Sequence, residues 1–105
     1  MKLQFLYYED CPSHDVALER LQQVMAEEGI ETGIEIIKVE TDEQAEHWQF
    51  VGSPTIRVNG QDIEPLPENA HFALTCRAYT LEDGRISPLP SLDMIRHPLQ
   101  ALSES

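Results

Sequence analysis

Basic residues and long apolar runs are scarce in this sequence, and each shortage excludes a class of protein. Seven Lys and Arg residues stand against nineteen Asp and Glu residues, so the formal net charge is −12. A surface of this charge repels nucleic acid and anionic lipid, and we therefore expect no nucleic acid and no membrane as partners. The sequence has no run of about eighteen apolar residues, the length that a membrane-spanning helix requires.

We expect no secretory signal at the N-terminus, and this expectation affects how the two cysteines of the chain are interpreted. Lys2 is followed by a short apolar stretch that ends at Glu9 and Asp10, without a small-residue cleavage site. We therefore expect a cytoplasmic protein, in which two cysteines are more often redox-active or metal-binding than a permanent cross-link. The 105 residues have room for one domain, residues 1–105, and we expect a monomer or a weak dimer.

The first part of the chain predicts a strand that runs directly into a cysteine and then into a helix. Apolar and aromatic residues dominate positions 3–8, which is typical of a strand buried on both faces. From His14 the apolar residues recur at three- and four-residue intervals, with Ser13 as the expected N-cap and Gly29 as the C-cap glycine. Cys11 therefore lies just before a helix N-terminus, where free N–H groups and the helix dipole stabilise a thiolate.

The rest of the chain alternates between strand and helix patterns. We expect helices at about 14–28, 41–48 and from 91 onward, and strands at about 34–39, 55–58 and 61–64. An acidic loop with prolines covers 65–71, and an extended segment at about 73–79 precedes a turn at Asp83-Gly84. Thr41 begins a capping-box pattern, and Asn59-Gly60 predicts a hairpin. Because Pro98 has no backbone N–H, we expect the last helix to kink or stop near His97.

This order of elements resembles the thioredoxin and glutaredoxin superfamily. Two motifs carry the resemblance: Asp10-Cys11-Pro12-Ser13-His14 after the first strand, and Gly52-Ser53-Pro54-Thr55 before the third. The resemblance implies an α/β fold, a thioredoxin-like βαβαββα sandwich, here with an extra extended segment before the C-terminal helix. It also implies that Cys11 is a nucleophile toward disulfides.

The second motif implies a site for the substrate backbone. In the superfamily, the proline before the third strand is cis and packs against the active cysteine, and the neighbouring backbone pairs with an extended thiol peptide or with glutathione. Carried over to this chain, Pro54 becomes the cis-proline, and Ser53 and Thr55 become substrate contacts. No bound cofactor is implied, although glutathione is a possible co-substrate.

The chain departs from the dithiol members at the position three residues after Cys11. That position is His14 instead of a second cysteine, which leaves three possibilities. Cys11 acts alone and glutathione supplies the second thiol, or Cys76 is a distant partner, or Cys11, His14 and Cys76 together bind a soft metal. If the two cysteines pair, the closed loop of roughly 65 residues contributes about 4 kcal/mol in the loop-entropy model.

The roles of the other site candidates stay open at this point. A protonated His14 would lower the pKa of Cys11, whereas neighbouring acidic side chains would raise it, and His14 could equally be a solvent-exposed residue of the first turn. Cys76 could instead be a small buried hydrophobe. Arg77 could bind a substrate carboxylate, such as that of glutathione, or only a neighbouring Glu.

Three functions remain in competition. The first is thiol–disulfide exchange with protein or low-molecular-weight disulfides, through Cys11. The second is binding of mercury, copper or zinc, since the spacing of Cys11, His14 and Cys76 is faintly similar to that of the organomercurial lyases. The third is a redox-inactive interaction module. A sulfur–sulfur distance of about 2 Å would identify a disulfide, whereas a Cys11 sealed in the interior would contradict the redox hypothesis.

Overall fold

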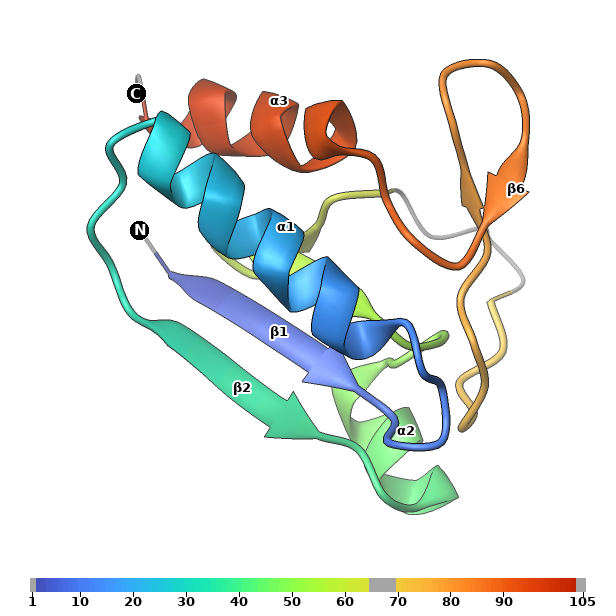
Figure 1. The fold of residues 1–105 in the computed structure, drawn as a ribbon. Helices are drawn as coiled ribbons and strands as arrows, with labels where there is room; N and C mark the ends of the chain where they lie inside the picture. The colour runs from blue at the N-terminus through green and yellow to red at the C-terminus, as the bar shows by residue number, and fades with distance from the viewer. Residues whose placement is uncertain (1, 65–69, 104–105) are drawn as a thin grey trace.

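A computed structural model describes residues 2–64 and 70–103 and has a mixed α/β fold (Figure 1). The elements follow one another as β1 (Leu3–Tyr7), α1 (His14–Glu27), β2 (Ile34–Lys38), α2 (Asp42–Trp48), β3 (Thr55–Val58), β4 (Gln61–Asp62), β5 (Tyr79–Thr80), β6 (Ile86–Ser87) and α3 (Leu92–Ser103). The α/β class predicted from the sequence is confirmed. The loop expected at 65–71 lies mostly outside the described residues, because residues 65–69 are not described.

The main sheet has four strands in the order β2-β1-β3-β4. β1 and β2 are parallel, and α1 forms the crossover between them, as the sequence pattern predicts. β3 runs antiparallel to β1 and turns back into β4 through Asn59-Gly60. Because β1 lies between β2 and β3, the chain that leaves its C-terminal end emerges beside the segment that leads into β3.

Apolar side chains cover both faces of β1. Leu3 and Phe5 belong to a core with α1 and α3, which lie side by side over one face of the sheet (Figure 1). Leu6 points to the opposite face and packs with Ala45 of α2 and with Phe50. This double burial explains the uninterrupted apolar run in the first strand and fixes the position of the loop that follows it.

Two local predictions about helix ends hold only in part. Ser13 occupies the N-cap position of α1, but its side chain makes no capping hydrogen bond. Of the kink or stop expected near His97, the stop does not occur, since α3 continues through Pro98 to Ser103, and the kink stays a prediction. Ile95 and Leu99, on either side of Pro98, are both fully buried, and their packing offsets the missing backbone hydrogen bond.

The predicted extended segment at 73–79 is also shorter than expected. Only Tyr79 and Thr80 form a strand, and they pair with Ile86 and Ser87 around the turn at Asp83-Gly84. Thr41 and Ser91 cap α2 and α3 through their hydroxyl groups, which accept from Gln44 N and Met94 N. The cap at Thr41 is the one that the capping-box pattern predicts.

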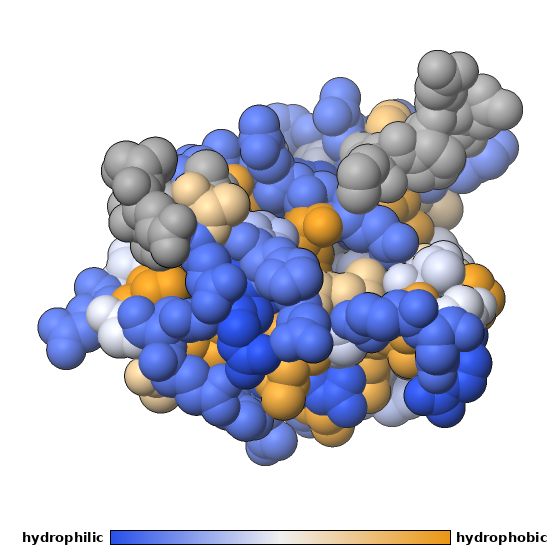
Figure 2. All heavy atoms as spheres, turned by 90° about the horizontal axis from the view of Figure 1, so that it is seen from above, coloured by the Kyte–Doolittle hydropathy of each residue, from blue (hydrophilic) through white to orange (hydrophobic). Residues whose placement is uncertain are grey.

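Hydrophilic side chains cover most of the face seen from above α1 and α3, and apolar side chains appear there in small separate groups (Figure 2). Across the part of the chain that the structure describes, no helix combines the length and the apolar character that crossing a membrane requires.

Candidate functional site

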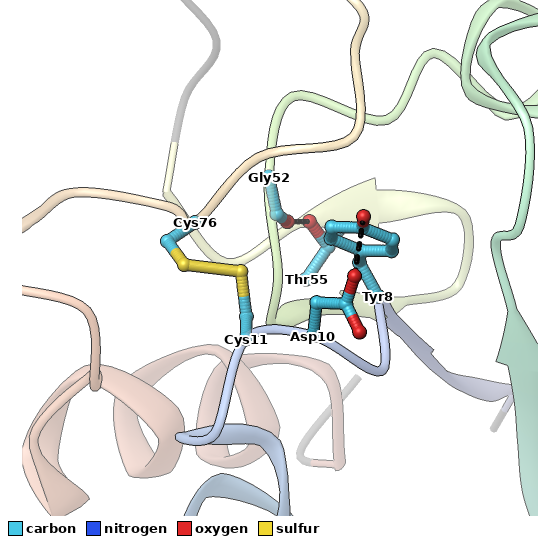
Figure 3. Close-up of a disulfide and its surroundings, with 6 residues drawn as sticks. All are labelled: Tyr8, Asp10, Cys11, Gly52, Thr55 and Cys76. Atoms are coloured by element: carbon cyan, nitrogen blue, oxygen red, sulfur yellow. Dashed lines mark hydrogen bonds between the residues drawn. A yellow bond between two sulfur atoms is a disulfide. The ribbon is translucent and has the colours of Figure 1, made fainter.

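The two cysteines of the chain form a disulfide. The Sγ atoms of Cys11 and Cys76 lie 2.22 Å apart and the Cα atoms 5.7 Å apart, across 65 positions of sequence. Figure 3 shows the bond joining the loop in front of α1 to the segment around Cys76. Of the three possibilities left open for Cys11, the structure therefore contains the pairing with Cys76.

Cys11 sits in the tight loop between β1 and α1. Its N–H donates to the carbonyl of Tyr8 at 3.1 Å, and only 2% of the residue is exposed. This burial is the condition that contradicts a redox hypothesis in which Cys11 itself attacks the substrate, so a redox role requires another sulfur that solvent can reach. The first turn of α1 begins three positions later at His14, so its unpaired N–H groups lie close to Cys11 along the chain.

Cys76, in contrast, is an exposed residue. Its neighbours bind the backbone of Ser53 from both sides: Ser53 N–H donates to Thr75 O at 2.8 Å, and Arg77 N–H donates to Ser53 O at 2.9 Å. Ser53 and Cys76 thereby form an isolated parallel bridge. The chain's own segment 75–77 thus occupies the backbone groups that the sequence resemblance assigns to a substrate.

Gly52 permits this close approach. Its φ is +152°, and a Cβ built there would lie 2.8 Å from both the Cα and the N of Arg77. Side chains larger than hydrogen are excluded at that distance. Gly52 belongs to a motif that can be recognised in the sequence, but its contact with residue 77 could not be predicted, because no local pattern links positions 25 residues apart.

The Ser53–Pro54 peptide bond is cis, as the resemblance implies. The Pro54 carbonyl accepts a hydrogen bond of 2.6 Å from the hydroxyl of Tyr79, which is completely buried. Burial raises the pKa of Tyr79 above its usual value, so the hydroxyl remains a donor throughout the ordinary pH range. Sequence reasoning gave Tyr79 no role at this site.

Arg77 is held inside the protein. Its guanidinium donates to Asp62 Oδ2 at 2.6 Å, to Thr55 Oγ1 at 3.2 Å and to Glu64 O at 3.1 Å, and it lies 4.8 Å from the centre of the Tyr79 ring. Burial lowers the pKa of Arg77, but the Tyr79 and Asp62 side chains outweigh that effect and leave the pKa raised. Of the two alternatives for Arg77, the structure contains the ion pair within the chain, but the carboxylate belongs to Asp62 and not to a Glu.

Thr55 and Ser53 are fully buried as well. The Thr55 hydroxyl donates to Gly52 O at 2.6 Å (Figure 3) and accepts from Arg77. Thr55 and Arg77 therefore have side-chain partners within the chain, whereas Ser53 is paired through its backbone alone and its buried Oγ has no hydrogen-bond partner. In this disulfide form they organise the segment that carries Cys76, and their contact with a substrate stays a prediction.

His14 is partly buried rather than exposed in the first turn. Its ring lies 4.7 Å from that of Tyr7 between centroids, and its Nδ1 is 3.2 Å from Asp15 Oδ1. Its side chain is 19% exposed. These contacts position His14 on β1 and α1, and the effect of His14 on the thiol of Cys11 stays a prediction.

The metal hypothesis finds no matching geometry among residues 2–64 and 70–103, where no group of three or more His, Cys, Asp or Glu side chains could hold an ion. What the site offers chemically is a disulfide with one buried and one exposed cysteine, a bond that thiolates can attack and re-form. No family model, no curated protein and no solved structure matches this chain.

Proposed function

We propose that this protein is a thiol–disulfide oxidoreductase in which Cys11 and Cys76 alternate between a disulfide and a dithiol. It acts in the cytoplasm on protein or low-molecular-weight disulfides, and glutathione is a candidate co-substrate. The observation that carries the proposal is the position of the bond: it joins a cysteine at a strand–helix junction to an exposed cysteine next to Ser53. Thiol–disulfide exchange requires an accessible sulfur and a second sulfur within bonding distance, and this pair supplies both.

We also propose that the fold is thioredoxin-like. The order β1-α1-β2-α2-β3-β4, followed after an insertion by α3, supports this assignment. The insertion carries Cys76 together with β5 and β6 and replaces the missing second cysteine of the motif. In this interpretation, the segment before β3 holds a piece of the chain itself against the active cysteine.

Two other functions compete with this proposal. Soft-metal binding would need both sulfurs as thiolates with a further ligand, and the described residues do not present such a set. A redox-inactive interaction module, in which the bond is a permanent cross-link, is the stronger competitor, since a bond that closes a loop of 65 positions stabilises the fold without any chemistry. The exposure of Cys76 favours exchange over a permanent cross-link.

The test is reduction of a disulfide-bonded protein such as insulin by dithiothreitol, with and without the wild-type chain. We expect the chain to accelerate the reaction by at least about tenfold, and the Cys11→Ser variant to lose the acceleration, because release of the partner needs both sulfurs. Ala78→Ser serves as the matched control, since it adds a hydroxyl at an exposed position two residues from Cys76 and leaves both sulfurs in place.

A second measurement separates exchange from a permanent cross-link. In glutathione buffers poised at about −250 mV, structural disulfides stay oxidised, whereas exchanging ones equilibrate. A Cys11–Cys76 bond that remains fully oxidised there, with no acceleration of insulin reduction, would refute the proposed function. Full activity of Cys11→Ser would refute it as well.

A further inference from the structure

We propose that Cys76, and not Cys11, is the sulfur that bonds covalently to the partner during exchange. This inference rests on the proposed function and reverses the order that the sequence resemblance implies. It depends on three features of the site: the unequal burial of the two cysteines, the helix behind Cys11, and the rigid support of the segment around Cys76.

Burial separates the two sulfurs most clearly. An attacking thiolate approaches a disulfide sulfur from the side opposite the leaving sulfur, so that side must be open. Cys11 is 2% exposed and follows a strand that is buried on both faces. Cys76 is exposed, and so are its neighbours Thr75 and Ala78. A partner therefore reaches Cys76 from solvent, whereas reaching Cys11 requires displacement of packed chain.

The position of Cys11 suits the complementary role of the internal thiolate. It precedes α1, whose N-terminal N–H groups and dipole stabilise negative charge. Asp10 works against this effect, but Asp10 Oδ2 accepts a hydrogen bond of 2.8 Å from the hydroxyl of Tyr8 (Figure 3), which disperses part of its charge. A buried thiolate of this kind can attack only the sulfur already held next to it, which is that of Cys76.

The segment around Cys76 stays in place when the disulfide opens. The backbones of both neighbours of Cys76 are hydrogen-bonded to the backbone of Ser53. The Arg77 guanidinium donates a hydrogen bond to the Asp62 carboxylate, and the Tyr79 hydroxyl donates one to the Pro54 carbonyl. None of these contacts involves the sulfur atoms. The segment therefore keeps the sulfur of Cys76 close to that of Cys11, and the step that re-forms the disulfide is intramolecular.

The reaction balances as two displacements. Starting from the dithiol, the Cys76 thiolate attacks one sulfur of a partner disulfide, a Cys76–partner bond forms, and the partner's own sulfur–sulfur bond breaks. The electron pair stays on the second partner sulfur, which takes up the proton that Cys76 released. The Cys11 thiolate then attacks the Cys76 sulfur, the Cys11–Cys76 bond forms, and the first partner sulfur leaves and takes up the proton of Cys11. The partner is reduced and the protein is oxidised.

Trapping with a matched pair of variants tests the assignment. Each reduced variant keeps one cysteine, so a partner captured by the exchanging sulfur cannot be released by the other. Incubated with insulin, Cys11→Ser should accumulate at least tenfold more covalent complex than Cys76→Ser on non-reducing gels. Equal trapping, or more trapping by Cys76→Ser, would overturn the inference.

The wild-type chain gives a second test that does not depend on how the variants fold. The reduced protein is mixed with cystamine, quenched with acid at early times and digested with pepsin, which keeps mixed disulfides in place for mass spectrometry. The cysteamine adduct should be on the Cys76 peptide, and an adduct on the Cys11 peptide would overturn the inference. If the wild type reduces insulin but the adduct is on Cys11, only this inference fails. If neither insulin nor cystamine reacts, the proposed function fails with it.

Discussion

Asp62 holds the segment that carries Cys76 through a buried ion pair with Arg77. Its carboxylate is 7% exposed and faces the Arg77 guanidinium, which is 5% exposed, at 2.6 Å. Replacing Asp62 by Asn keeps the volume but removes the carboxylate that contacts the buried guanidinium, and the expected loss in the free energy of unfolding is about 3 kcal/mol. Urea denaturation of the oxidised protein measures this loss.

The control for this substitution is the solvent-exposed pair of Asp83 and Arg85, whose side chains are 53% and 77% exposed. Asp83→Asn should change the free energy of unfolding by no more than about 0.5 kcal/mol. Equal effects of Asp62→Asn and Asp83→Asn would mean that the buried pair has no special part in holding the segment of Cys76.

Tyr79 makes stability depend on pH at the alkaline end. Burial raises the pKa of Tyr79 in the folded protein above the usual value of 10.0 for a tyrosine, so the folded state keeps a proton that the unfolded state loses. The stabilisation is complete below pH 10 and declines as the pH rises beyond it, with a slope of about 1.4 kcal/mol per pH unit for one group. In Tyr79→Phe, this contribution to the decline of the free energy of unfolding above pH 10 should be absent.

The measurement for Tyr79 is the difference in the free energy of unfolding between wild type and Tyr79→Phe at several pH values. At pH 8 the variant should be less stable by about 1 kcal/mol, because it has lost the hydrogen bond to Pro54 O. Above pH 10 the difference should shrink. A difference that is constant from pH 8 to pH 11 would show that Tyr79 ionises equally in both states.

Residues with distinctive chemistry could be identified from the sequence, and their partners could not. Cys76 and Arg77 attract notice anywhere in a chain, and both lie at the site. Asp62 and Tyr79 were missed because their contacts join positions 15 and 25 residues apart, and no periodicity records such a contact. For the same reason the sequence left Cys76 as one of several possible partners of Cys11.

At the scale of elements, the sequence predicted the bounds of those helices and strands that local residue patterns determine. β3 was predicted at its observed bounds, and α1, α2, β1 and β2 to within one or two residues, because apolar periodicity and caps mark them directly. The helix did not stop near His97, because the burial of Ile95 and Leu99 on either side of Pro98 favours its continuation. The pairing of segment 75–77 with Ser53 was not predictable, since it depends on how the insertion folds back.

Gly52 controls that pairing and can be tested at the same scale. In Gly52→Ala the new Cβ would meet the backbone of Arg77, so segment 75–77 must move away from Ser53. The equilibrium constant for closing the Cys11–Cys76 disulfide in a glutathione buffer should fall by at least about tenfold, because the two sulfurs are no longer held together. Thiol alkylation followed by mass spectrometry measures the oxidised fraction.

Gly33→Ala is the control for this experiment. Gly33 has nothing within 4 Å of a built Cβ, and its φ lies outside the region that favours glycine. Its substitution should leave the closing equilibrium within about twofold of wild type. If Gly52→Ala closes the disulfide as readily as Gly33→Ala does, then the contact between Gly52 and Arg77 does not position Cys76.

At the scale of the whole molecule, the net charge of −12 should select among partners by their charge. Long-range attraction raises the association rate of cations with an anionic protein and lowers that of anions. Cystamine, which is cationic, should therefore oxidise the reduced protein faster than glutathione disulfide, which is anionic. Salt shortens the range of the field from about 30 Å at 0.01 M to about 3 Å at 1 M, so the ratio of the two rates should fall as salt is added.

Neutral hydroxyethyl disulfide separates this effect of charge from intrinsic reactivity. Its rate should change little with salt, because it carries no charge for the field to act on, whereas the rate for cystamine should fall and that for glutathione disulfide should rise. If the rates for all three reagents change with salt concentration in the same way, then the charge of the protein does not affect reactions at the two cysteines. In that case the local setting of Cys76, and not the acidic surface, would decide which disulfides the protein accepts.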